Sequence, residues 1–213
     1  MHLVFAARGF AYAKLGQHEL AIRDYGNAIA NGTIFSNSGI DLPTVYFNRG
    51  LSNTKLDNPL AAILDFTNAI ELDPGMAHAY ASRGLAYSQQ GQTQDAITDY
   101  TKAVQLDPDD AATYYHRGNI YLALEQFQNA IEDYTQAVKI DPGFDAPYTN
   151  RGNAYSKQDQ PQDALRDYDK AIQLNPDNAL AYYNRGVGLG NLGKNSLAEK
   201  DFNKACELDR SLC

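Results

Sequence analysis

The chain of 213 residues lacks the features that define several large classes of proteins. It has no tryptophan. No run approaches the roughly 18 uninterrupted apolar residues of a transmembrane helix, so direct insertion into a membrane is not expected. Its two cysteines, Cys206 and Cys213, lie at the C-terminal end and cannot supply a disulfide framework. Such sparse cysteine usage predicts a reducing, cytoplasmic location.

Positive charge is also scarce. The chain has 18 lysines and arginines against 26 aspartates and glutamates, which gives a formal net charge of −8, and it contains no basic run. A chain of this charge repels phosphate backbones unless its few cations are clustered. Neither nucleic acid nor an anionic membrane surface is therefore expected as a partner.

Patterns of catalytic or ligand-binding residues are missing as well. The four histidines show no metal-ligand spacing, and no nucleophile lies beside a base in any recurring arrangement. Residues 188–193 match the pattern G-x-G-x-x-G, but a dinucleotide site needs that loop between a strand and a helix. The sequence therefore predicts no catalytic residue, no metal site and no cofactor, and hence a protein that is not an enzyme.

What the chain does have is a repeated unit. The dipeptide Arg-Gly occurs six times, and its last five copies are 34 residues apart. A fixed period of this size indicates one supersecondary unit that stacks on copies of itself. With the recurring glycine as position 8, the repeats span residues 2–35, 43–76, 77–110, 111–144, 145–178 and 179–212. The insertion 36–42 is rich in Gly, Ser and Asn, and is either a surface loop or a contact element.

Within each repeat, the apolar residues follow two helical patterns. They fall at positions 4, 8, 11 and 14 and then at 20, 21, 24, 27 and 28, with a break between the two sets. Positions 20 and 27 are alanine in all six repeats, and positions 4 and 24 are aromatic. Proline at position 32 ends the second helix in four of them. Each repeat is thus predicted to form a helix A, a short turn and a helix B.

This pattern of aromatic, glycine, alanine and proline positions resembles the tetratricopeptide repeat family over essentially the whole chain. The resemblance implies an all-α fold, a right-handed superhelical α-solenoid of six helix-turn-helix units that forms a single array over residues 1–213. It also implies a concave groove lined by the A helices. Members of this family are overwhelmingly protein-interaction scaffolds.

Two charged columns run through the repeats, with arginine always at position 7 and aspartate always at position 23. Position 7 lies in the middle of the apolar stripe of helix A, and position 23 flanks the inner face of helix B. A buried guanidinium is costly unless it is paired, and its fork fits a carboxylate. The columns predict a ladder of structural Arg–Asp pairs and not a catalytic site.

The opposite face of helix A, positions 2, 5, 6, 9, 12 and 13, varies from repeat to repeat and is the candidate binding surface. Asparagine offers a donor and an acceptor that match a peptide backbone, and aromatic rings add apolar contact. These residues could equally be solvated polar side chains. The residues expected to line a peptide-binding groove are Phe47, Asn48, Tyr115, His116, Asn119, Asn150, Asn153, Lys157, Tyr183 and Asn184.

The sequence predicts a non-enzymatic adaptor that binds an extended peptide of unknown identity in this groove. The carboxylate clamp by which some members of the family bind chaperone tails requires lysine at positions 2 and 5, and no repeat has lysine at either. Chaperone binding through that clamp is therefore not expected. Two alternatives stay open: a scaffold that self-associates into homo-oligomers through the ends of the stack, and the targeting region of a larger protein.

Overall fold

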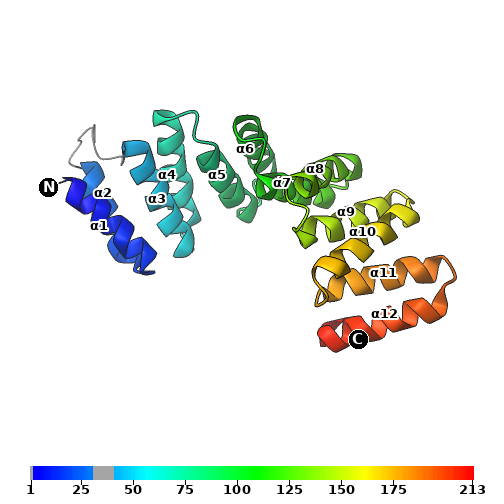
Figure 1. The fold of residues 1–213 in the computed structure, drawn as a ribbon. Helices are drawn as coiled ribbons and strands as arrows, with labels where there is room; N and C mark the ends of the chain where they lie inside the picture. Colours follow the sequence, from blue (N-terminus) through cyan, green and yellow to red (C-terminus); the bar gives the residue numbers. More distant parts are fainter. Residues whose placement is uncertain (1, 31–40) are drawn as a thin grey trace. The chain divides into compact units, whose positions relative to one another are not determined.

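The computed structural model describes residues 2–30 and 41–213, and these residues form twelve α-helices and one 3-10 helix but no strand (Figure 1). The all-α prediction is confirmed. Residues 36–40 of the predicted insertion lie outside the described part of the chain. The helices are, in chain order, α1 (His2–Lys14), α2 (His18–Ala30), α3 (Leu42–Lys55), α4 (Pro59–Leu72), α5 (Ala77–Gln89), α6 (Thr93–Leu106), α7 (Ala111–Ala123), α8 (Phe127–Ile140), α9 (Asp145–Lys157), α10 (Pro161–Leu174), α11 (Ala179–Asn191), α12 (Asn195–Leu208) and η1 (Arg210–Leu212).

The helices pack in consecutive pairs, as the repeat pattern predicts. The chain divides into two compact units, Met1–Pro108 with α1 to α6 and Asp109–Cys213 with α7 to η1. Within each unit every A helix packs on the B helix of its own repeat, and the B helix in turn contacts the A helix of the next repeat. Figure 1 shows these pairs side by side within each unit.

Each A helix ends in a turn whose second residue after the helix has a positive φ. In three repeats this residue is glycine, which adopts the left-handed conformation without a steric penalty. In the other three it carries a side chain, as at Glu125, where φ is 58°. The six residues at this position are Gly16, Asp57, Gly91, Glu125, Asp159 and Gly193.

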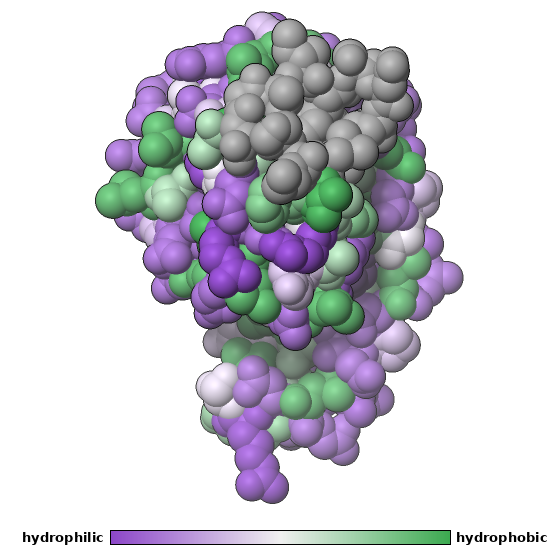
Figure 2. Space-filling model, turned by 90° about the vertical axis from the view of Figure 1, so that its left-hand side faces the viewer, coloured by the Kyte–Doolittle hydropathy of each residue, from purple (hydrophilic) through white to green (hydrophobic). Residues whose placement is uncertain are grey.

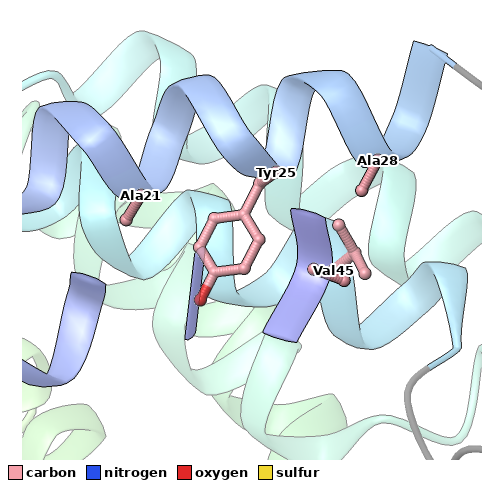
Figure 3. Packing of buried hydrophobic residues seen from close by; sticks show 5 residues of the cluster. Ala21, Tyr25, Ala28 and Val45 are labelled. Atoms are coloured by element: carbon pink, nitrogen blue, oxygen red, sulfur yellow. The ribbon is translucent and has the colours of Figure 1, made fainter. Parts of the chain in front are cut away.

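Small residues let the two helices of a repeat approach closely. In the first repeat Ala21, Tyr25 and Ala28 of α2 are buried together with Val45 of α3 (Figure 3). The glycine at position 8 lies against the aromatic ring at position 24 in every repeat: a Cβ atom on Gly152 would lie 2.6 Å from the Tyr168 ring. Close helix contact therefore depends on a glycine opposite a ring.

The A helices bury a second stripe of residues to which the sequence pattern gave no role. Position 3 is buried in every repeat after the first, as Val45, Ala79, Thr113, Pro147 and Ala181, and position 10 is buried as Ser52, Ala86, Ile120 and Ala154. The physical reason, seen at α3, α5, α9 and α11, is that the A helix packs between two B helices, its own and that of the preceding repeat. Each of these two contacts buries its own stripe of residues. The stripe that faces the preceding B helix is made largely of small side chains, which add little to the hydrophobic pattern of the sequence.

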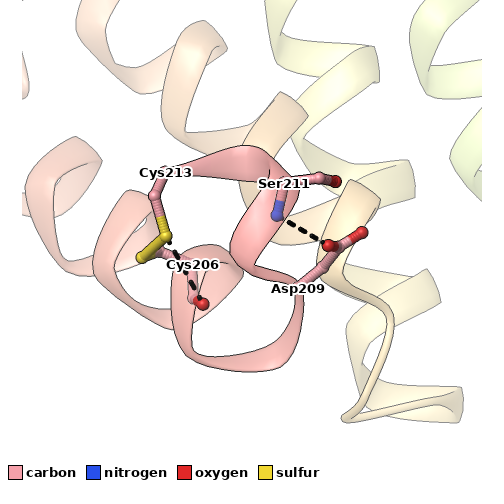
Figure 4. The surroundings of a disulfide bond; sticks show 4 residues. All are labelled: Cys206, Asp209, Ser211 and Cys213. Carbon is pink, nitrogen blue, oxygen red and sulfur yellow. Dashed lines mark hydrogen bonds between the residues drawn. A yellow bond between two sulfur atoms is a disulfide. The ribbon is translucent and has the colours of Figure 1, made fainter.

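The two cysteines behave differently from the sequence-based expectation, because Cys206 in α12 and Cys213 after η1 are joined by a disulfide (Figure 4). Their Cα atoms lie 4.8 Å apart. The backbone amide of Ser211 donates to the Asp209 carboxylate and shapes the turn that brings Cys213 back to α12. The cysteines thus no longer support a reducing location, and the cytoplasmic assignment stays a prediction. No helix in the described residues is long and apolar enough to cross a membrane.

Candidate functional site

The arginine and aspartate columns form the predicted ladder of ion pairs. In each repeat the arginine of helix A contacts the aspartate sixteen residues later in helix B. The contact is two-pronged at Arg151, whose Nε and Nη2 each donate to Asp167 over 2.8 Å. The guanidinium carbon of Arg151 also lies 5.6 Å from the ring centroid of Tyr148 and 6.0 Å from that of Tyr155. The arginine is held on all sides and ties helix A to helix B.

These arginines also join neighbouring repeats. Nη1 of Arg151 donates over 3.0 Å to Thr135 on the B helix of the preceding repeat, and Arg83 makes the same bond to Thr67. Arg185 instead reaches Asp169, with a distance of 2.6 Å. A guanidinium that serves both its own helix pair and the preceding one has little capacity left for a ligand. The most regular charged residues of the chain are therefore structural.

Four of the predicted groove asparagines come together in two identical hydrogen-bonded rungs. Asn119 Oδ1 in α7 accepts from the hydroxyl of Tyr134 and from Nδ2 of Asn150 in α9, each over 2.8 Å. One repeat later, Asn153 Oδ1 accepts from Tyr168 and from Asn184 Nδ2, again over 2.8 Å each. The asparagines are therefore not independent solvated side chains, because each rung links three helices of two repeats.

Each rung leaves one donor group and one acceptor atom free. Within the described residues, Nδ2 of Asn119 and of Asn153 has no protein hydrogen-bond partner, nor has Oδ1 of Asn150 and of Asn184. All four side chains are half-buried. An amide that is already fixed by one hydrogen bond offers its other group at a defined place, which lowers the entropy lost on binding.

A cavity of about 530 Å³ lies beside the second rung, on the face formed by α7, α9 and α11. Its walls include four predicted groove residues, Asn153, Lys157, Tyr183 and Asn184. The sequence pattern missed the rest of the lining, which comprises Leu122, Ala123, Glu125, Phe127, Ser156, Tyr168 and Val187. One signal was present at position 13, where Ala123 replaces the Lys, Gln or Asn of the other five repeats.

The other predicted groove residues have different surroundings. The ring of Tyr115 lies 5.0 Å from that of Phe144 and 6.2 Å from that of Tyr134, so Tyr115 supports the core of its repeat. His116 lies beside it, and burial lowers the pKa of its imidazole. Phe47 and Asn48 belong to α3 in the unit Met1–Pro108 and do not line this cavity.

The phosphate-loop pattern has no matching structure. Gly188 and Gly190 lie inside α11, and Gly193 follows in the turn with a φ of 74°. The segment is therefore a helix and its turn, as the repeat pattern predicted, and it follows no strand in the described chain. Among the described residues, no group of three His, Cys, Asp or Glu side chains could hold a metal ion.

Comparison with protein families places the repeat pattern in a known group. Models described as "Tetratricopeptide repeat" match residues 43–76, 111–144, 146–178 and 167–200, and a model described as "TPR repeat" matches residues 84–124. The comparison with curated protein sequences gives no match.

Several solved structures share the fold. MamA is 26% identical with a TM-score of 0.73, and the match covers 79% of this chain and 92% of MamA. YrrB, described as a TPR protein with an unusual peptide-binding site, is 22% identical with a TM-score of 0.73, over 88% of this chain and 94% of YrrB. The C-terminal part of a TPR repeat-containing protein from Cytophaga hutchinsonii is 19% identical with a TM-score of 0.78, over 95% and 78%.

Proposed function

Because the chain belongs to the tetratricopeptide repeat family, whose members are protein-interaction scaffolds, we propose that it is a non-enzymatic adaptor that binds an extended peptide across α7, α9 and α11. The observation that carries this proposal is the pair of asparagine rungs, Asn119 with Asn150 and Asn153 with Asn184. The same arrangement recurs after one repeat, as a site for a chain of repeating amide groups requires.

The chemistry of the rungs matches a peptide backbone. Each rung has a free amide NH₂, which can donate to a peptide carbonyl, and a free amide oxygen, which can accept from a peptide N–H. Such bonds recognise any extended segment, whatever its side chains. YrrB, whose structure is described as having an unusual peptide-binding site, shares the fold, and this similarity supports peptide binding as the kind of function proposed for this chain.

The test measures binding of fluorescent random peptides by anisotropy, first to the wild-type chain and then to Asn150→Ala/Asn184→Ala. Loss of two backbone contacts is expected to weaken binding by about tenfold or more, since each hydrogen bond contributes about 0.5–1.5 kcal/mol. Asn48→Ala is the matched control, because Asn48 occupies the same position 6 but lies outside both rungs.

Two results would remove the proposal: no binding of any peptide to the wild type, or equal affinity of the double variant. A thermal unfolding curve close to that of the wild type establishes that the variant is folded.

A second candidate function, self-association through an end of the stack, has its own observation on α1. Val4 is 62% exposed and Leu15 is 71% exposed, whereas Val45, at the position of Val4 one repeat later, is fully buried. The B helix of the preceding repeat covers Val45, and no described helix covers Val4. On the side of the molecule seen in Figure 2, apolar residues (green) are scattered among hydrophilic ones (purple).

Light scattering over a range of concentrations tests this second candidate. Oligomers that form in the wild type and dissociate in Val4→Asp would support it, and a monomer at every concentration would remove it. Phe202 in α12 is not a suitable site for such a charge, because its ring packs on Gly186 and a charged residue there would disturb the repeat itself.

A further inference from the structure

We propose that the cavity on α7, α9 and α11 receives one large apolar side chain of the bound peptide, and that Lys157 contacts an acidic side chain beside it. This inference rests on the proposed peptide binding and adds the kind of peptide. The rungs explain how a backbone could be held, but they do not distinguish one peptide from another. The cavity walls supply that distinction.

The cavity walls suit an apolar occupant. The volume of about 530 Å³ falls within the range of roughly 300–1,000 Å³ that is typical of ligand pockets. Its apolar lining is partly exposed in the free protein, with 37% of Tyr183 and 39% of Val187 open to solvent. Covering these side chains with an apolar group is favourable, because the gain is about 25 cal/mol for each Å² removed from water.

Two polar groups of the wall are compatible with this occupant. The hydroxyl of Tyr168 already donates to Asn153, and Nδ2 of Asn184 already donates to the same oxygen. An apolar side chain that displaces water from the cavity therefore costs these groups no hydrogen bond. The free groups of the rung, Nδ2 of Asn153 and Oδ1 of Asn184, remain for the peptide backbone that carries the side chain.

One departure from the repeat pattern marks this cavity. Position 13 carries Ala123 where five repeats have a longer side chain, and the short side chain leaves the space open. Glu125 lines the same cavity at the turn after α7, with the positive φ that all six repeats have at this position.

The charges at the cavity select the neighbouring residue of the peptide. Within the described residues, the side chains of Lys157 and Glu125 make no ion pair or hydrogen bond with any other side chain. The ammonium of Lys157 is the one cation of the lining and is available to a carboxylate. Glu125 repels a second acidic residue, so the peptide carries its acidic side chain on the Lys157 side of the apolar residue.

The first arm of the experiment selects short random peptides displayed on phage against the wild-type chain. The recovered peptides are expected to be enriched in a large aliphatic or aromatic residue next to an aspartate or glutamate. Ala123→Phe fills the cavity and should weaken binding of the recovered peptides by roughly thirtyfold, as the loss of a central anchor does. Gln89→Phe is the matched control: it places the same ring at position 13 of another repeat, outside the cavity, and should leave binding unchanged.

The second arm reverses the charge. Lys157→Glu should weaken binding of peptides with the acidic residue by about tenfold and should restore binding when that residue is replaced by lysine. Lys55→Glu, at position 13 of the second repeat, is the matched control and should change neither affinity.

The outcomes separate this inference from the proposed function. Peptides that bind through Asn150 and Asn184 but show no apolar enrichment, and that bind Ala123→Phe as well as the wild type, would overturn the inference and leave the adaptor function intact. Apolar enrichment without any response to Lys157→Glu would overturn the acidic neighbour. Failure of the wild type to bind any peptide would remove the adaptor function, and the inference with it.

Discussion

The first and fifth repeats carry the same arginine and aspartate, yet these side chains have different surroundings. The side chain of Arg8 is 46% exposed, whereas that of Arg151 is 14% exposed. Arg151 is covered by the preceding B helix and donates to Thr135 there, and no described helix takes that place beside Arg8. The position of a repeat in the stack therefore decides how deeply its ion pair is buried, although the two residues of the pair are the same in both repeats.

The tyrosine at position 24 differs between the same two repeats. The hydroxyl of Tyr168 donates to Asn153, but the hydroxyl of Tyr25 is buried without a hydrogen-bond partner in the described structure. The reason is the residue at position 9, which is asparagine in the fifth repeat and Phe10 in the first. Asn153, which belongs to the candidate binding face, thus also accepts a hydrogen bond from the buried tyrosine of its own repeat.

The largest effect on stability is expected when the ion pair of the fifth repeat is broken. Arg151→Ala leaves the buried Asp167 carboxylate without its partner and should lower the free energy of unfolding by about 3–5 kcal/mol. Arg8→Ala should cost less, because water already reaches that side chain. Urea denaturation followed by circular dichroism measures both, and equal losses would contradict the role given to burial.

A glycine next to a ring should give the second largest effect. In Gly152→Ala the new Cβ would lie 2.6 Å from the ring of Tyr168, so the helices must separate, at a cost of roughly 1–3 kcal/mol. Gly26→Ala in the first repeat meets nothing closer than 3.8 Å and should stabilise the chain by up to about 1 kcal/mol through helix propensity. Thermal unfolding should shift in opposite directions for the two variants.

Removal of the hydroxyl group should have a smaller effect on stability, and this effect should differ between Tyr168 and Tyr25. Tyr168→Phe removes a hydrogen bond and should cost about 1 kcal/mol, whereas Tyr25→Phe removes a buried unpaired hydroxyl and should be neutral or stabilising. Phe10→Asn should make Tyr25 resemble Tyr168 by giving its hydroxyl an acceptor. A loss of stability in Tyr25→Phe as large as in Tyr168→Phe would show that Tyr25 has a partner in solution.

The last effect appears only at alkaline pH. Burial raises the pKa of Tyr25 to about 12 from its ordinary value of 10. Because the unfolded chain loses this proton first, the contribution of Tyr25 to stability is complete below pH 10 and is lost as the pH rises through 12. Urea midpoints measured from neutral pH to about pH 11 should fall less steeply in Tyr25→Phe than in the wild type. Identical slopes would contradict the raised pKa.

Much of the fold could be predicted from the sequence, because the same pattern of residues occurs in six repeats. The helix pairs and the Arg–Asp ladder follow from a 3.6-residue period and from the cost of an unpaired buried charge. The buried stripe that includes Val45 and Ala86 could not be assigned, because small residues at a contact between repeats give no hydrophobic period. The disulfide was also missed, since the return of the chain through η1 has no counterpart among the described residues of the other repeats.

The sequence pattern identified the asparagines of the candidate site but not the hydrogen bonds between them. Asn119, Asn150, Asn153 and Asn184 could be picked out one by one as variable residues on the exposed face of helix A. Their bonds to one another join residues 31 positions apart, and a one-dimensional pattern does not show which of two amides donates and which accepts. The cavity likewise combines residues of five helices and one turn.

The sequence by itself determined the repeat, its helices and the pairing of arginine with aspartate, because these depend on residues within one unit of fixed spacing. Only the tertiary structure decided which arginine is covered, which tyrosine finds an acceptor and where the A helices leave a cavity. These properties depend on the residues that a neighbouring repeat brings against each side chain. In a stack of near-identical units, local interactions build each unit, and contacts with the neighbours make each unit different.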